Sequence, residues 1–230
     1  MFARSLLLWL LLPAVSIADG GMLSAVSLLY REQEPGTDPY QVRTLVTDAF
    51  VRSDDGSAAG DFLLFDRRAR VLYNVVHDDR TILVIPERKV DLAVPGTLEL
   101  EERFRPESEA PRIGGRAVSS FVLNANGELC REGMVVPGLL PGVTRALIEL
   151  ERVLARQQVA TLYKTPQEFR TPCFLANYLY ATDRMLQRGL PIQDGIRGGR
   201  HRVLLDFDPD YRAEEALFRL PEGYRRYSIE

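Results

Sequence analysis

The chain has very little of the chemistry that builds metal centres and nucleophilic active sites. Its 230 residues include two cysteines and two histidines, and Lys89 and Lys164 are its only lysines. His77 and His201 lie far apart, and no H-x-x-x-H spacing offers two zinc ligands on one helix face. No G-x-S-x-G, P-loop or dinucleotide-binding glycine pattern occurs either. The sequence therefore predicts no catalytic residues, no metal and no cofactor, and we expect that the protein is not an enzyme.

Three aspartates near the C-terminus imitate part of a calcium loop. Asp206, Asp208 and Asp210 alternate as the first three ligands of such a loop do. Tyr211 stands where the loop needs glycine, and Leu217 stands where it needs a bidentate glutamate. The pattern favours exposed acids at the end of a strand and leaves open only a weak calcium site.

A basic surplus is also missing. The chain has 29 Lys+Arg against 32 Asp+Glu, a net charge of −3, and the arginines are scattered among the acids. A nucleic-acid-binding protein normally shows a basic stripe, so we expect no nucleic-acid partner. With 46% apolar and 27% charged residues, the composition is that of an ordinary globular chain.

The first eighteen residues have the pattern of a secretory signal peptide. Arg4 precedes an apolar run at 5–15, and small residues at Ser16 and Ala18 mark a cleavage site, which leaves Asp19 as the mature N-terminus. The run is shorter than the ~20 residues that a membrane-spanning helix needs, and no cysteine follows it for lipid attachment. We therefore expect a periplasmic protein without a membrane span after cleavage, made of a signal peptide at 1–18 and a single domain at 19–230.

Export changes how the two cysteines are interpreted. Cys130 and Cys173 have no neighbouring histidine or cysteine at a metal-ligand or catalytic spacing. In an oxidising compartment such a pair is most simply a disulfide. We expect a bond that closes a loop of 43 positions.

The first half of the mature chain reads as a run of short strands. Apolar or β-branched segments at 23–30, 41–52, 62–65, 71–76 and 81–85 are separated by turn-rich or charged connectors. In the segment at 41–52, Val42, Thr44, Val46 and Phe50 are expected to share one face. Connectors of about four residues fit hairpins and leave no room for helical crossovers. This half therefore predicts an antiparallel meander, and further strands are expected at 97–104, 117–123 and 128–135.

The hydrophobic period then changes to that of a helix. From Gly142 to Gln158 the apolar residues recur at intervals of three and four. A second helix is expected to begin at Thr171, as the N-cap, and to end at Gly189. A strand at 202–207 and an extended segment at 218–227 follow. The expected fold class is α+β, a curved antiparallel sheet, or half-open β-barrel, packed on two or more helices.

Two short stretches carry a resemblance to a known group of proteins. A glycine-containing strand start at 113–115 is followed by a cysteine-bearing strand, and the C-terminus carries the phrase F-x-[apolar]-P-x-G-Y. Phe218, Leu220, Pro221, Gly223 and Tyr224 match this phrase. In these features the chain resembles the periplasmic lipoprotein-carrier superfamily of LolA and LolB and neighbouring uncharacterised periplasmic domain families.

The resemblance implies an apolar cavity between sheet and helices that holds an acyl chain or a similar hydrophobic ligand. The protein would then be a non-catalytic carrier, with a lipid-like small molecule and an envelope protein as its expected partners. Two alternatives stay open: an envelope interaction or structural protein with a filled core, and, less favoured, an envelope hydrolase. The candidate ligand-binding residues, each of which could equally be core, are Phe50, Phe62, Leu64, Tyr73, Val75, Ile82, Val84, Phe174, Tyr178 and Leu179.

Overall fold

The computed structural model describes residues 21–57 and 59–229. The predicted signal peptide at 1–18 and its cleavage site lie outside the described residues. The strands are β1 (Met22–Ser24), β2 (Val26–Gln33), β3 (Tyr40–Val46), β4 (Phe50–Asp54), β5 (Phe62–Asp66), β6 (Val71–Val76), β7 (Thr81–Pro86), β8 (Leu100–Pro106), β9 (Ser119–Ala125), β10 (Glu128–Val136), β11 (Leu190–Ile196), β12 (His201–Asp208), β13 (Arg212–Glu214) and β14 (Arg225–Ser228). The α-helices are α1 (Pro141–Thr161), α2 (Pro172–Leu175) and α3 (Arg184–Arg188), accompanied by the short turns η1 (Leu162–Lys164), η2 (Gln167–Phe169), η3 (Ala176–Tyr180) and η4 (Glu215–Phe218).

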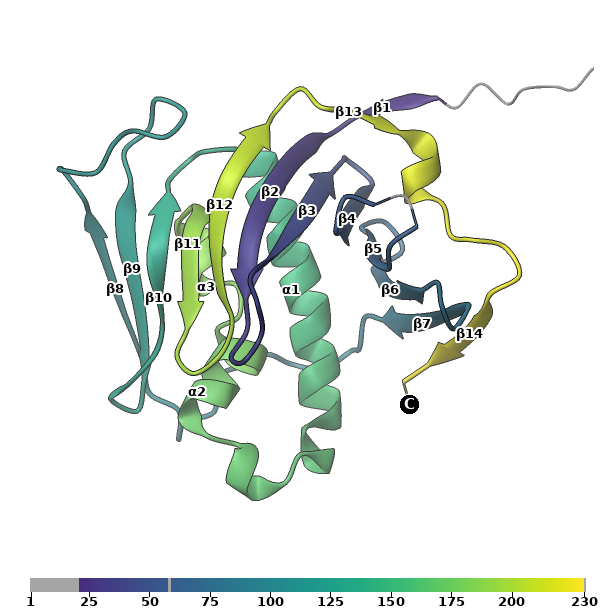
Figure 1. Cartoon of the computed structure of the whole chain (residues 1–230). Coiled ribbons are helices and arrows are strands. Elements are labelled where there is room, and N and C mark those ends of the chain that lie inside the picture. The colour runs from purple at the N-terminus through teal and green to yellow at the C-terminus, as the bar shows by residue number, and fades with distance from the viewer. Residues whose placement is uncertain (1–20, 58, 230) are drawn as a thin grey trace, which may run out of the picture.

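Twelve of these strands form one large curved sheet (Figure 1). Its order is β14-β7-β6-β5-β4-β3-β2-β12-β11-β10-β9-β8, and β1 pairs with β13 in a separate two-stranded sheet. The consecutive run from β2 to β7 confirms the predicted meander. All pairs are antiparallel except β14 with β7, which is parallel. The α+β class and the curved sheet are thus confirmed, but the sheet is not closed into a barrel, and β14 and β8 form its two edges.

The centre of the sheet is a seam between distant parts of the chain. On one side β2 pairs with its neighbour β3, and on the other side it pairs with β12, so that Gln33 lies opposite His201. One half of the sheet, β14 to β2, therefore joins the other half, β12 to β8, through this single pairing.

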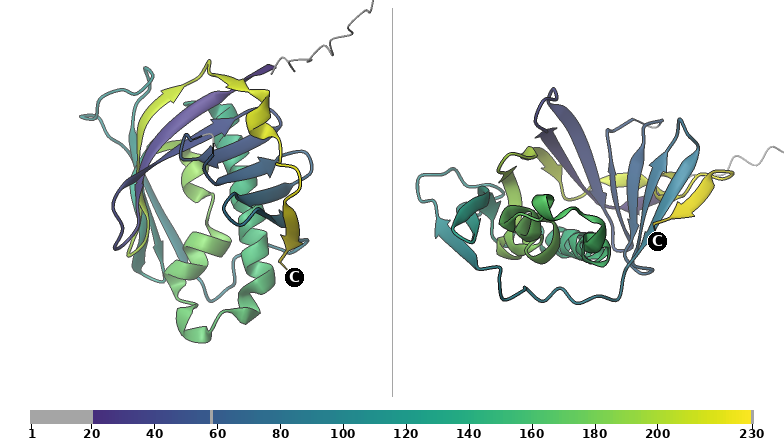
Figure 2. Two further views of the ribbon diagram at one scale, coloured as in Figure 1. Left: turned by 45° about the vertical axis from the view of Figure 1, so that its right-hand side comes forward. Right: turned by 90° about the horizontal axis from the view of Figure 1, so that it is seen from below.

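The long helix α1 lies in the concave side of the sheet (Figure 2). Its buried residues Val143, Ala146 and Val153 pack with strand residues such as Val51 and Phe65. In the right-hand view of Figure 2 the helices lie between the sheet and the connector 87–99, which runs from β7 to β8. The amphipathic helix predicted for 142–158 is confirmed, and the apolar face that it buries contributes about 25 cal/mol per Å² removed from water.

The convex side of the meander is also apolar and is covered by the C-terminal segment. Ala213 and Phe218 join the buried core on this side, and the Phe218 ring stacks on Phe50 with centroids 5.8 Å apart. Gly223 has φ +73°, so the chain turns within the C-terminal phrase. The extended segment predicted from Phe218 onward is wrong at its start, because Phe218 ends the short turn η4, which folds its ring onto the sheet, and the strand itself is β14.

The predicted disulfide is present. Cys130 of β10 is bonded to Cys173 of α2, with their Cα atoms 4.9 Å apart. The bond fastens α2 to β10. It also places Cys130 in a separate core cluster with residues of β9 and α3, including Phe121 and Met185.

The second predicted helix begins as expected but does not continue. The Thr171 hydroxyl accepts a hydrogen bond from the Phe174 backbone N–H at 3.2 Å, as an N-cap does. The chain then forms α2, the π-helical turn η3, a break at 181–183, and α3. The carbonyl of Thr182 accepts a hydrogen bond from the Arg131 guanidinium at 3.0 Å, so a contact with the sheet takes the acceptor that an unbroken helix would use.

No helix of the described chain, 21–57 and 59–229, is both long and apolar enough to cross a membrane.

Candidate functional site

Two cavities lie along the contact between the sheet and α1, on either side of a filled middle. The filled part includes Phe65 and Ala146, both fully buried. The first cavity, of about 650 Å³, lies beside the beginning of α1 and is called here the α1-start cavity. The second, of about 440 Å³, lies beside the middle of α1 at the opposite ends of β2 and β3 and is called the α1-middle cavity. The sheet–helix layer is therefore neither one open pocket nor a solid core.

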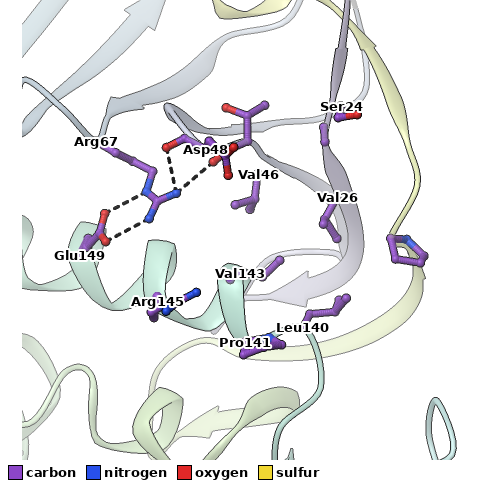
Figure 3. A pocket seen from close by; sticks show the side chains of 14 residues that line it. Ser24, Val26, Val46, Asp48, Arg67, Leu140, Pro141, Val143, Arg145 and Glu149 are labelled. Atoms are coloured by element: carbon purple, nitrogen blue, oxygen red, sulfur yellow. Dashed lines mark hydrogen bonds and ion pairs between the residues drawn. The ribbon is translucent and has the colours of Figure 1, made fainter.

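The α1-start cavity is crossed by a closed set of polar contacts (Figure 3). Arg67 donates to both carboxylate oxygens of Glu149, at 2.8 and 3.0 Å. Its remaining guanidinium contacts are with the backbone carbonyls of Thr47 and Asp48, both at 3.1 Å. Because Arg67 and Glu149 satisfy each other, this cavity presents no buried charge that needs a ligand.

The α1-middle cavity has an apolar wall on its helix side. Leu147, Leu150 and Leu154 recur at intervals of three and four and line it from α1. Leu63 of β5 lines it from the sheet, with Val42 of β3. All five leucine and valine side chains are half-buried or exposed toward the cavity and not closed into the core. This wall offers an apolar ligand a surface of the kind that small-molecule sites present.

Charged side chains lie at one end of the α1-middle cavity, where Glu32 and Arg202 line it and further charges lie beside them. Glu32 of β2 and Asp194 of β11 both lie directly opposite Arg202 of β12 in the sheet register. Arg131 of β10 adds two hydrogen bonds to Asp194, at 2.6 and 2.8 Å, and the Arg202 Nε lies 3.0 Å from the same carboxylate. We call Glu32, Arg202, Asp194 and Arg131 the charge ladder. It runs across four strands on the helix-facing side of the sheet.

The side chains of the charge ladder are largely buried. The Asp194 side chain is 1% exposed and that of Arg131 is 4% exposed. Burial alone would raise the pKa of Asp194, but the positive charges of Arg131 and Arg202 hold it well below its usual range. Burial also raises the pKa of Tyr30, which lies under the Arg202 guanidinium, to about 12. Strongly perturbed groups gathered at a cavity mark a candidate functional site.

Glu151 of α1 faces this end of the cavity from the helix side. Burial raises the pKa of its carboxyl, and the nearest charges include Arg131, Arg200 and Arg202. Within 21–57 and 59–229, no hydrogen bond or close ion pair holds this carboxylate. The uncharged form of Glu151 is therefore more strongly favoured than the uncharged form of an exposed glutamate would be.

Two arginines at the cavity mouth have unused hydrogen-bonding capacity. Arg200 lies 3.6 Å from Glu32 and 3.7 Å from Asp194, and Arg202 contacts Asp194 through a nitrogen that is buried without an aligned acceptor. Neither guanidinium donates a hydrogen bond to another residue of the described chain. A guanidinium presents five N–H donors in a planar fork that fits carboxylate and phosphate groups. The site can therefore accept an oxygen-rich group at its charged end and an apolar group along α1.

The structure corrects the position of most of the predicted ligand-binding residues. Seven of the ten belong to the convex side of the meander, under the C-terminal segment, and not to the concave side that faces α1: Phe50, Phe62, Leu64, Tyr73, Val75, Ile82 and Val84. Of these, only Phe62 also reaches the edge of the α1-middle cavity. Phe50 was expected to share a face with Val46, but the two lie on opposite sides of the sheet. The segment at 41–52 is two strands, joined by a turn in which the Thr47 hydroxyl accepts a hydrogen bond from the Phe50 N–H at 2.8 Å.

The three predicted helix residues do not meet the other seven. Phe174 and Tyr178 contact each other with ring centroids 5.6 Å apart, and Tyr178 is 43% exposed, so these residues do not dock wholly on the sheet. Leu179 is buried, but it lines a different hollow, between the connector 87–99 and the helices. The π-helical turn η3 separates these side chains, because an extra residue in the turn rotates those after it around the helix axis.

Sequence reasoning missed the charge ladder and both cavity arginines. A signal for them exists: Glu32 lies two residues after Tyr30 and four after Leu28, so it has the phase of buried residues in its strand. Arg202 likewise shares the phase of Leu204. A charged residue at a strand position that faces the core needs a partner of opposite charge. The pattern therefore indicates a buried ion pair, but it does not identify the second residue of the pair.

Metal ligands are not assembled in the described part of the chain. No group of three or more His, Cys, Asp or Glu side chains there could hold a metal ion. Asp206, Asp208 and Asp210 follow one another along β12 and the turn after it, and all three are exposed.

Comparisons with known proteins find little. No protein-family model and no curated protein matches the chain. Structures of PNGF-II in the C2 and P21 space groups are similar over 90% of this chain at 11% sequence identity, with TM-scores of 0.42 and 0.41. The chain spans 31% and 32% of the length of those two chains. A proposal about function therefore depends on the geometry of the site.

Proposed function

We propose that this protein is a non-catalytic binding or carrier protein for a lipid-like or acyl ligand, exported to the periplasm. The ligand would occupy the α1-middle cavity, between the sheet and α1. The observation that carries the proposal is the row of Leu147, Leu150 and Leu154, which leaves an apolar helix face open to a cavity of about 440 Å³. A volume in the range of roughly 300–1,000 Å³ is typical of small-molecule sites.

The other features of the chain support this reading. The resemblance to the periplasmic lipoprotein carriers implies a hydrophobic ligand between sheet and helices. The signal-peptide pattern at 1–18 and the bond between Cys130 and Cys173 fit an oxidising compartment.

Native mass spectrometry after mild purification tests the proposal. We expect a co-purified hydrophobic molecule that is lost in the variant Leu150→Phe, whose larger side chain projects into the α1-middle cavity. Val26→Phe is the matched control, because Val26 lines the α1-start cavity instead. If both variants fold and neither changes a bound mass, or if Val26→Phe alone removes it, the α1-middle cavity is not the binding site.

A second candidate function rests on the filled middle of the sheet–helix layer. Val51, Phe65 and Val153 pack there without a cavity. An envelope interaction or structural protein would need only this packing and would act through its surface. Protein that carries no bound mass and does not take up a fluorescent fatty acid would favour this alternative over the carrier.

The proposed export is tested separately. Protein produced in a Gram-negative host is expected in the periplasmic fraction, with a sequence that begins at Asp19. Retention of the first eighteen residues in soluble protein would contradict the cleavage that we predict.

A further inference from the structure

We infer that the ligand is an anionic amphiphile, whose carboxylate or phosphate group binds Arg200 and Arg202 at the mouth of the α1-middle cavity. The inference rests on the proposed function, because it names the class of ligand for the same site. It adds a prediction that the proposed function does not make, namely that the charge of the head group decides the affinity.

The positions of the two arginines carry the inference. Both line the α1-middle cavity, as do Leu150 and Leu154 of the apolar wall. A single ligand can therefore contact the leucines with its chain and the guanidinium groups with its head. The Arg202 guanidinium lies 4.9 Å from the centre of the Tyr30 ring, which limits the orientations that its plane can take.

The hydrogen bonds of the neighbouring arginine show the contrast. Arg131 donates to both oxygens of Asp194 and to the carbonyl of Thr182, so its fork is occupied by protein groups. Arg200 has only longer ion-pair contacts, at 3.6 and 3.7 Å, and its side chain is 30% exposed. Arg200 can thus turn toward a ligand without breaking a hydrogen bond, whereas Arg131 cannot.

The charges around this end of the cavity also favour an anion. Arg131, Arg200 and Arg202 face Asp194, Glu32 and Glu151. Arg200 has no carboxylate within hydrogen-bonding distance, because its ion-pair contacts with Glu32 and Asp194 are 3.6 and 3.7 Å long, so an anionic head group can bind it directly.

The acids on the far side of the cavity are largely committed to other partners. Asp54 binds Arg43 and Arg52, at 2.8 and 2.6 Å. Asp55 and Asp61 accept the backbone N–H groups of Ser57 and His77, at 2.7 and 2.8 Å. The two arginines that line the cavity lie beside Glu32, away from these acids, and we expect the head group there.

Binding measurements on delipidated protein test the inference. Oleate, monooleyl phosphate, oleyl alcohol and a zwitterionic oleyl phosphocholine share one chain and differ in the head group. We expect both anions to bind with a Kd about tenfold or more below that of the alcohol, a factor typical of a charge-assisted hydrogen-bonding site. The ratio of oleate to monooleyl phosphate tells which of the two anionic groups the site prefers.

The variant Arg200→Gln isolates the contact. It should weaken binding of the anions about tenfold and leave the alcohol unchanged. Arg197→Gln is the matched control, because Arg197 is an exposed arginine on the same hairpin that does not line the cavity. Thermal denaturation of both variants verifies that they fold as the unchanged protein does.

The outcomes separate the two proposals. If the alcohol or the zwitterion binds as tightly as the anions, or if Arg197→Gln weakens anion binding as much as Arg200→Gln, the inference is overturned and the carrier function stands. If none of the four probes binds, the proposed function itself is overturned, and the inference with it.

Discussion

Asp194 is the residue whose neutralisation should damage the fold most. It accepts two hydrogen bonds from Arg131 and lies within 3.0 Å of Arg202 and 3.7 Å of Arg200. In Asp194→Asn the side chain keeps its shape, but an NH2 group replaces one of the two carboxylate oxygens. This group is a hydrogen-bond donor and would face the N–H donors of Arg131. The variant therefore leaves positive charge in a buried place without its counterion.

The size of the effect follows from that burial. Removing one partner of a buried ion pair costs roughly 3–5 kcal/mol, because the other charge stays desolvated. For a domain of this length, 1 kcal/mol corresponds to about 2–4 °C in the melting temperature, so we expect a decrease of about 6–20 °C at neutral pH. The pKa of Asp194 is below its usual range in the fold, so this stabilisation is present above the unfolded value of about 4 and is lost as the pH falls below it.

Urea and thermal denaturation measure the loss, and the slope of the urea curve verifies that only the stability has changed. Glu215→Gln is the control, because it removes an exposed ion pair with Arg219 and should leave the midpoint unchanged. Combining Asp194→Asn with Arg131→Met should cost less than the sum of the two single changes, since each removes the charge that the other leaves alone. A midpoint for Asp194→Asn equal to that of Glu215→Gln would refute the argument that the charge ladder is buried and mutually dependent.

Four further predictions concern the rest of the fold. Reduction of the bond between Cys130 and Cys173 should lower stability by about 4 kcal/mol on the chain-entropy estimate for a 43-residue loop, and unchanged melting in reductant would contradict it. Burial raises the pKa of Tyr30 to about 12, so between pH 10 and 12 the free energy of unfolding of the unchanged protein should fall by about 3 kcal/mol more than that of Tyr30→Phe. Parallel pH profiles of the two proteins would argue against the burial of this side chain. A chain that ends at Ala216 should be less stable by several kcal/mol, because each large buried apolar side chain contributes roughly 1.5–3 kcal/mol, and equal melting would make the C-terminal segment a loose tail. Gly133→Ala should cost about 1–3 kcal/mol, because its new Cβ would lie 2.1 Å from a backbone oxygen of β11; a neutral effect would show that the two strands can separate.

Local patterns predicted a large part of the fold. The meander, the helix α1 and the strands β9 and β10 each depend on residues close in the sequence, so hydrophobic period and turn-forming residues were enough to place them. The disulfide needed only a count of cysteines and a compartment. The break after Tyr180 could not be predicted in this way, because its cause is the contact of Arg131 with the Thr182 carbonyl, residues that are distant in the sequence.

The face of the meander was predicted wrongly for a physical reason. In β5 the adjacent residues Leu64 and Phe65 are both buried, one under the C-terminal segment and the other under α1. When both faces of a sheet are covered, alternation separates the residues into two sets but does not tell which set meets the helix. The candidate site suffered from the same ambiguity, and the charge ladder additionally requires pairings among β2, β10, β11 and β12 that no local pattern specifies.

The pairing of β2 with β12 has a consequence for the order of folding. Glu32 and Arg202 reach each other only through this seam, so the charged end of the α1-middle cavity does not exist in a chain whose two half-sheets are still apart. Contacts between such distant residues form slowly, because a long loop must close before they add stability. A refolding chain should therefore gain native-like circular dichroism before it can capture a fluorescent fatty acid, and the delay between the two signals would time the closure of the seam. During that interval the apolar strands at the seam are open edges, so the refolding chain should aggregate most readily before the seam closes.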